Sequence, residues 1–112
     1  MGLRFLENSN ATSAFSVTRS RYPIFRSLRK VQDGRFELIW PENQQTRSQD
    51  LPKGWHYVGQ FHWVNVEQYL ALPKLMGVNS HPVKIPPCKV QDIDTEEDWE
   101  LAEKLFRICQ LP

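Results

Sequence analysis

The sequence has few glycines, few cysteines and no long apolar run, and each shortage excludes a class of protein. Its five glycines are scattered over 112 residues, so no glycine-rich loop can cradle a triphosphate with backbone N–H groups. No apolar run approaches the length of a membrane span, and the opening residues, MGLRFLENSN, lack the apolar segment of a secretory signal. We therefore expect no membrane partner.

The two cysteines, Cys88 and Cys109, match no spacing of zinc ligands. Without a secretory context, such a pair is expected to remain as reduced thiols packed in the interior. The sequence therefore predicts a cytoplasmic protein with free thiols.

Net charge is also nearly absent, because 14 basic residues face 13 acidic ones and leave a formal charge of +1. This balance offers no general affinity for nucleic acid or for an anionic membrane. The charges are unevenly placed, since residues 1–50 carry eight Lys or Arg against five Asp or Glu, and residues 51–112 carry six against eight. Residues 1–50, which carry the excess of positive charge, could bind an acidic substrate.

The clearest secondary-structure signal lies in residues 89–106, KVQDIDTEEDWELAEKLF, which are typical of a strand that leads into a helix. Thr95 suits the N-cap, and Asp98 is the acidic partner of a capping box, so the helix should begin at Glu96. Apolar residues then recur at helical spacing, which predicts a surface helix docked on a core. The side chains expected to point inward are Leu101, Leu105 and Ile108.

Asp92 and Asp94 lie just before this helix. On an extended chain, residues two apart point to the same side, roughly 7 Å from each other. Two carboxylates at the end of a strand can hold Mg²⁺, which takes one or two carboxylates alongside water and phosphate oxygens. Alternatively, both acids solvate the turn and favour the helix N-terminus. Spacing alone favours this second interpretation, because short acidic patterns are common.

Residues 41–54, PENQQTRSQDLPKG, form a polar loop that is long for a compact domain, and such loops are usually functional or mobile. Arg47 offers a forked guanidinium to a carboxylate or phosphate, and Gln49 can both donate and accept hydrogen bonds. The alternative is a solvated loop, which these residues alone favour.

His62 has no second histidine or cysteine at a convincing spacing, so we expect an ordinary packed or hydrogen-bonded histidine.

Short strands mixed with helical pieces favour an α/β fold over a helix bundle or a sandwich. Asp33 and Gly34 suit a two-residue type I′ turn. Gly59 in mid-strand is typical of close approach by another backbone or a ligand.

Residues 2–8 resemble the last turns of a helix, but no N-cap residue precedes them. We therefore expect the chain to be part of something longer. Helices are expected at residues 2–8 and 66–72, and strands at 14–18, 24–31, 36–40, 57–64, 82–85 and 88–92.

Three segments together, FSVTRSRYPIFRSL, TRSQDLPKGWHYVGQFHWV and VQDIDTEEDWELAEKLF, resemble the carboxyl-terminal half of the acylneuraminate cytidylyltransferases. They are most similar to the branch that activates pseudaminic acid. The resemblance implies a nucleotidyltransferase that joins CTP to a nine-carbon acidic sugar, pseudaminic or sialic acid, with Mg²⁺, giving the CMP-sugar and pyrophosphate. It also implies a doubly wound α/β fold, of the nucleotide-diphospho-sugar-transferase type, that usually dimerises.

By position, Asp92 and Asp94 match the metal-binding pair of this family, which reverses the preference drawn from spacing. Arg47 and Gln49 fall in the sugar-facing loop, and Gln60 and Phe61 match the neighbouring pocket strand. The amino-terminal half, with a phosphate loop of the type Ala-Arg-x-Gly-Ser-Lys, is missing. The resemblance therefore implies one partial domain over residues 1–112 that holds no catalytic residue and is inactive alone.

Two hypotheses follow. The chain is the sugar-side and metal-side half of a cytidylyltransferase, which works with a missing amino-terminal half or as a homodimer. Alternatively, it is a non-catalytic binding or dimerisation module that keeps a remnant of the fold.

Overall fold

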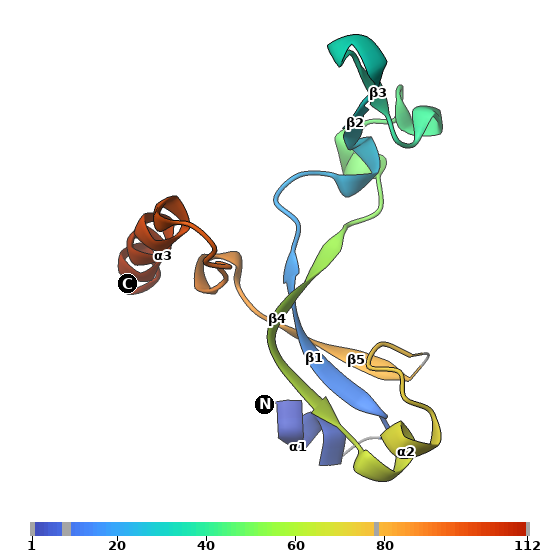
Figure 1. Cartoon of the computed structure of the whole chain (residues 1–112), viewed down its shortest axis with the longest axis vertical. Helices are drawn as coiled ribbons and strands as arrows, with labels where there is room; N and C mark the ends of the chain where they lie inside the picture. The colour runs from blue at the N-terminus through green and yellow to red at the C-terminus, as the bar shows by residue number, and fades with distance from the viewer. Residues whose placement is uncertain (1, 8–9, 78, 112) are drawn as a thin grey trace. The chain divides into compact units, whose positions relative to one another are not determined.

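The structure, a computed structural model, describes residues 2–7, 10–77 and 79–111 and has mixed α/β architecture, as predicted (Figure 1). The chain divides into two compact units, one made of Arg19–His56 and the other of the residues before and after that segment. The expectation of a single partial domain stays a prediction. The helices are α1 (Gly2–Glu7), α2 (Val66–Ala71) and α3 (Glu96–Cys109), and the strands are β1 (Ser13–Arg19), β2 (Leu28–Lys30), β3 (Phe36–Leu38), β4 (Trp55–Val64) and β5 (Ser80–Lys84).

The larger unit is built on a three-stranded sheet in the order β4-β1-β5. The central strand, β1, confirms the strand predicted over residues 14–18, and the side chains of Ala14 and Ser16 are fully buried. β5 pairs with β1 in parallel, with Phe15 opposite Pro82. A proline fits here because β5 lies at the edge of the sheet, where a missing N–H breaks no ladder on the outer side.

β4 confirms the strand predicted over residues 57–64 and begins two residues earlier. Gly59 has a φ of 64°, in the left-handed region that favours glycine. A Cβ atom added there would come no closer than 3.7 Å to the Tyr57 ring, so the expected close approach of another backbone is wrong among the described residues, and that of a ligand stays a prediction. The kinked backbone is supported by Ser16, whose Oγ accepts hydrogen bonds from the N–H groups of Gln60 at 3.1 Å and Phe61 at 3.4 Å.

The smaller unit contains the predicted hairpin. β2 and β3 are antiparallel, with Leu28 opposite Leu38, and Asp33 and Gly34 both have positive φ. The turn is longer than the predicted two residues, because the Val31 N–H donates to the Arg35 carbonyl and encloses three residues. The predicted strand over residues 24–31 is also shorter, since Ile24–Arg26 form a 3-10 turn.

The strand predicted over residues 88–92 is absent from the described structure. Pro87–Lys89 form a 3-10 turn instead, and Val90 continues in an extended conformation. Pro86 and Pro87 lack the N–H groups that a sheet ladder needs, and no neighbouring strand in the described residues pairs with this segment. The acidic pair therefore follows a loop and not a strand.

The expectation of reduced thiols is wrong, because Cys88 and Cys109 form a disulfide. Their Cα atoms lie 5.9 Å apart, within the usual range for such a bond. The two cysteines lie 21 residues apart in sequence but become neighbours because α3 returns its last turn to the 3-10 turn after β5. Spacing along the sequence could not reveal this proximity.

α3 begins at Glu96, as predicted, but its apolar side is covered only in part. Leu105 is buried, whereas Leu101 is 42% exposed and Ile108 is 59% exposed. The prediction that all three point into a core is therefore wrong for two of them. No helix in the described part of the chain is both long enough and apolar enough to cross a membrane.

Candidate functional site

The acidic segment before α3 is fixed by a reciprocal capping box. The Thr95 hydroxyl accepts from the Asp98 N–H at 3.2 Å, and Asp98 Oδ2 accepts from the N–H groups of Thr95 at 2.9 Å and Asp94 at 3.0 Å. These bonds, above all the one from the Asp94 N–H, hold the pKa of the Asp98 carboxyl below its usual value. Asp98 is therefore engaged in ordering the helix start.

Asp92 and Asp94 are both exposed and immediately precede this cap. Within residues 2–7, 10–77 and 79–111, neither carboxylate accepts a hydrogen bond or forms an ion pair, so both remain available to a ligand. The same residues contain no group of three or more His, Cys, Asp and Glu side chains placed to hold a metal ion. The pair can offer two oxygen ligands, and other ligands have to come from water or from a bound phosphate.

Gln60 connects the sheet to the acidic segment. Its Nε2 donates to the Lys89 carbonyl at 2.9 Å, while its backbone N–H is held by Ser16. Phe61, the next residue, is half-buried. In this structure the Gln60 side chain therefore holds the chain three residues before Asp92, which is a positioning role that sequence reasoning did not foresee.

Arg47 and Gln49 lie in the smaller unit, next to the 3-10 turn Ser48–Asp50. Both side chains are exposed. Arg47 uses Nε to bind Asp50 Oδ2 at 2.9 Å, in an ion pair at the surface. Such exposed pairs contribute little to stability, so an incoming carboxylate can compete for the guanidinium.

His62 is a packed and hydrogen-bonded histidine, as expected. Its Nδ1 lies 3.1 Å from the Tyr57 hydroxyl, and its ring is centred 5.2 Å from the Phe15 ring. These contacts explain the position of His62 without a catalytic role.

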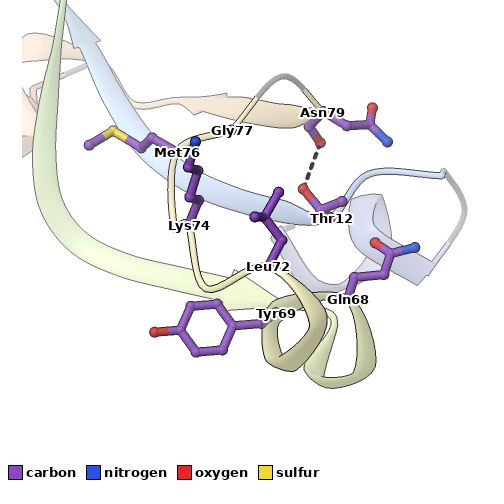
Figure 2. A pocket seen from close by; sticks show the side chains of 8 residues that line it. All are labelled: Thr12, Gln68, Tyr69, Leu72, Lys74, Met76, Gly77 and Asn79. Atoms are coloured by element: carbon purple, nitrogen blue, oxygen red, sulfur yellow. Dashed lines mark hydrogen bonds between the residues drawn. The ribbon is translucent and has the colours of Figure 1, made fainter.

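A hollow of about 520 Å³ lies at the end of the sheet where β1 and β5 begin (Figure 2). The sequence analysis did not predict it. Its side chains come from α2, from the loop that follows α2, and from the residues just before β1 and β5. Thr12 Oγ1 donates to the Asn79 carbonyl at 3.3 Å and closes one side. No motif marks this hollow, because Thr12 lies far along the chain from the other lining residues, which are Gln68, Tyr69, Leu72, Lys74, Met76, Gly77 and Asn79.

Comparison with known proteins identifies two similar curated proteins. The chain matches no protein-family model. It is 28% identical over 105 residues to the pseudaminic acid cytidylyltransferases of two Campylobacter jejuni subsp. jejuni strains, of serotypes O:23/36 and O:2. Each match covers 94% of this chain and 45% of the relative, so the chain spans less than half of their length. The resemblance predicted from the three segments is thereby confirmed: the chain is similar to pseudaminic acid cytidylyltransferases.

Proposed function

We propose that the chain provides the metal-binding and sugar-binding part of a cytidylyltransferase that activates a nine-carbon acidic sugar, pseudaminic or sialic acid, with CTP. The products would be the CMP-sugar and pyrophosphate. The observation that carries the proposal is the pair Asp92 and Asp94, whose carboxylates have no partner among the described residues and stand directly before a capped helix. The similarity to pseudaminic acid cytidylyltransferases supports it.

The donor set fits Mg²⁺. Asp92 and Asp94 supply two hard oxygen ligands, and Mg²⁺ is commonly held by one or two carboxylates that leave its remaining positions to water and phosphate. When bound, the ion would neutralise negative charge on the phosphates of the nucleotide. The role of this chain is to orient the two carboxylates, and the bond from the Asp94 N–H to Asp98 fixes the backbone of one of them.

In this proposal, Arg47 and Gln49 bind the sugar. An acidic sugar presents a carboxylate and several hydroxyls, which suit a guanidinium and an amide that both donates and accepts. Arg47 would exchange Asp50 for the sugar carboxylate. Gln60 and Phe61 lie in the larger unit, where they would form a substrate-facing strand, and the Gln60 side chain also holds the Lys89 carbonyl.

We further propose that these 112 residues alone do not form the CMP-sugar. Nucleotidyl transfer depends on positioning the reactants and on donors arranged around the phosphates. The five scattered glycines provide no phosphate loop. The complete enzyme would have the doubly wound α/β fold, and polypeptide equivalent to the rest of the relatives would supply the remaining donors.

The experiment is to incubate the purified chain with CTP, Mg²⁺ and pseudaminic or sialic acid and to measure pyrophosphate release. The assay is run with and without a polypeptide that carries the part of a Campylobacter jejuni relative that this chain does not match. We expect release only in the mixture. Release by the chain alone would refute its dependence on a second part. If neither sample releases pyrophosphate although the mixture forms a complex, the alternative of a non-catalytic binding or dimerisation module is favoured.

A further inference from the structure

α3 has one side that is covered in part and one side that is uncovered. Leu105 is only 9% exposed, and Cys109 is tied to Cys88, so this side rests against the 3-10 turn Pro87–Lys89. In contrast, Trp99 is 57% exposed and Phe106 is 66% exposed. Two large aromatic side chains on one well-capped helix are therefore left in water.

The uncovered side is hollowed. Trp99, Ala102 and Phe106 follow one another at spacings of three and four, which places them on the same face of the helix. With Ile93, they line a hollow of about 460 Å³, and Glu103 and Arg107 border it with one charge of each sign. An apolar surface that includes aromatic side chains and is bordered by charged groups is typical of a protein interface. We call the surface formed by Ile93, Trp99, Ala102 and Phe106 the α3 patch.

The relatives identify the occupant. Only seven residues of this chain, 112 less 105, lie outside the match, and α3 has 14 residues, so the match includes at least part of α3. In those proteins the equivalent segment belongs to a polypeptide more than twice as long, because the match covers 45% of it. The apolar face of a helix has to be buried against another element of structure. The unmatched 55% of the relatives is therefore the polypeptide that we expect to cover the apolar face of this helix.

We propose that the α3 patch is the docking surface for polypeptide equivalent to the unmatched part of the pseudaminic acid cytidylyltransferases. The proposal rests on the proposed function, because the identity of the partner comes from the same relatives. Docking would cover Trp99 and Phe106 on α3. Asp92 and Asp94 directly precede the N-cap of this helix. Docking would thereby bring the acidic pair to the phosphate-binding part of the enzyme.

The test is to co-express the tagged chain with the unmatched part of a Campylobacter jejuni relative, purify the complex, and measure its Kd by sedimentation. Phe106→Glu should raise the Kd at least tenfold, because it replaces a large apolar side chain of the patch by a charged one. Leu70→Glu is the matched control, since Leu70 is also a helical residue and is 74% exposed, but it lies on α2. This control should change the Kd less than twofold, and circular dichroism should show that both variants keep their helices.

Hydrogen exchange gives a second measurement that does not depend on a substitution, since residues 99–107 should become protected when the complex forms. Absence of a complex, equal effects of Phe106→Glu and Leu70→Glu, or no added protection would each overturn the proposal. Self-association of the lone chain that Phe106→Glu abolishes would also overturn it, in favour of a second copy as the occupant. A complex without pyrophosphate release would contradict only the proposed function, whereas pyrophosphate release that Phe106→Glu leaves unchanged would contradict only the docking surface.

Discussion

The segment that carries the acidic pair and the unit that carries Arg47 are held in different ways. Residues 88–109 are closed by a disulfide, started by a complete capping box and joined to β4 through Gln60. The unit Arg19–His56 has strands of three residues, several 3-10 turns, ion pairs that are exposed, and Leu51 as its one buried side chain. The proposed metal site is thus ordered in advance, whereas the proposed sugar loop depends on weak surface contacts and would gain order from a ligand or partner.

The largest expected effect concerns the disulfide, which is the strongest difference between the two regions. Closing a loop across 21 residues should stabilise the fold by about 3 kcal/mol. Cys109→Ser should therefore lower the free energy of unfolding by about this amount, as measured by urea denaturation. A reducing agent should have the same effect on the natural chain and none on a variant with serine at both positions. Two free thiols in protein prepared without reductant would contradict the disulfide.

The second effect concerns the kink in β4. Ser16→Ala removes the buried hydroxyl that accepts from the N–H groups of Gln60 and Phe61, so it should cost about 2 kcal/mol in the free energy of unfolding. Ser48→Ala, at an exposed position in the smaller unit, is the control and should be nearly neutral. An equal effect of the two substitutions would show that Ser16 does not support the kink.

The third effect tests the hairpin of the smaller unit. Gly34 has a φ of 74° and no atom within 4 Å of an added Cβ, so Gly34→Ala should cost about 1 kcal/mol through backbone strain alone. Gly77 is the matched control, because its surroundings are equally open and its φ lies outside the left-handed region. Gly77→Ala should leave thermal unfolding unchanged or raise its midpoint slightly. If Gly34→Ala is equally harmless, the turn does not have this conformation.

The smallest expected effect is the loss of α3 stability at low pH. Because the pKa of Asp98 is lower in the folded chain than in the unfolded chain, its contribution is complete above the unfolded pKa, at about pH 4, and is lost as the pH falls through the folded pKa. Helical circular dichroism should therefore decline on acidification below about pH 4. In Asp98→Asn this part of the decline should be absent. An identical pH profile in the two proteins would exclude the carboxylate as the source.

Sequence reasoning succeeded where structure depends on near neighbours. Thr95 and Asp98 lie three residues apart and determine the start of α3 without outside help, and Asp33 with Gly34 locates the hairpin. It failed where structure depends on distant partners. The segment 88–92, expected as a strand, has no strand beside it to pair with in the described structure. No sequence motif indicates that Cys88 and Cys109 form a disulfide.

The candidate site follows the same division. Spacing placed Asp92 and Asp94 on one side of the chain but favoured a role in the turn, and the resemblance assigned them to a metal; among the described residues, neither carboxylate has a partner. The bond from Gln60 to Lys89 could not be foreseen, because it joins β4 to a loop 29 residues further along the chain. The metal role of the two aspartates stays a prediction.

The most direct test of the proposed metal site is the binding of Mn²⁺, a paramagnetic substitute for Mg²⁺, to the ¹⁵N-labelled chain. We predict that millimolar Mn²⁺ broadens the amide signals of residues 91–98 first, and that Asp92→Asn with Asp94→Asn removes this broadening. Glu100→Gln with Glu103→Gln is the control, since it removes the same charge from α3 and should leave the broadening in place. Broadening that is spread evenly over the acidic residues, or that survives in the Asp92 and Asp94 variant, would contradict the metal site.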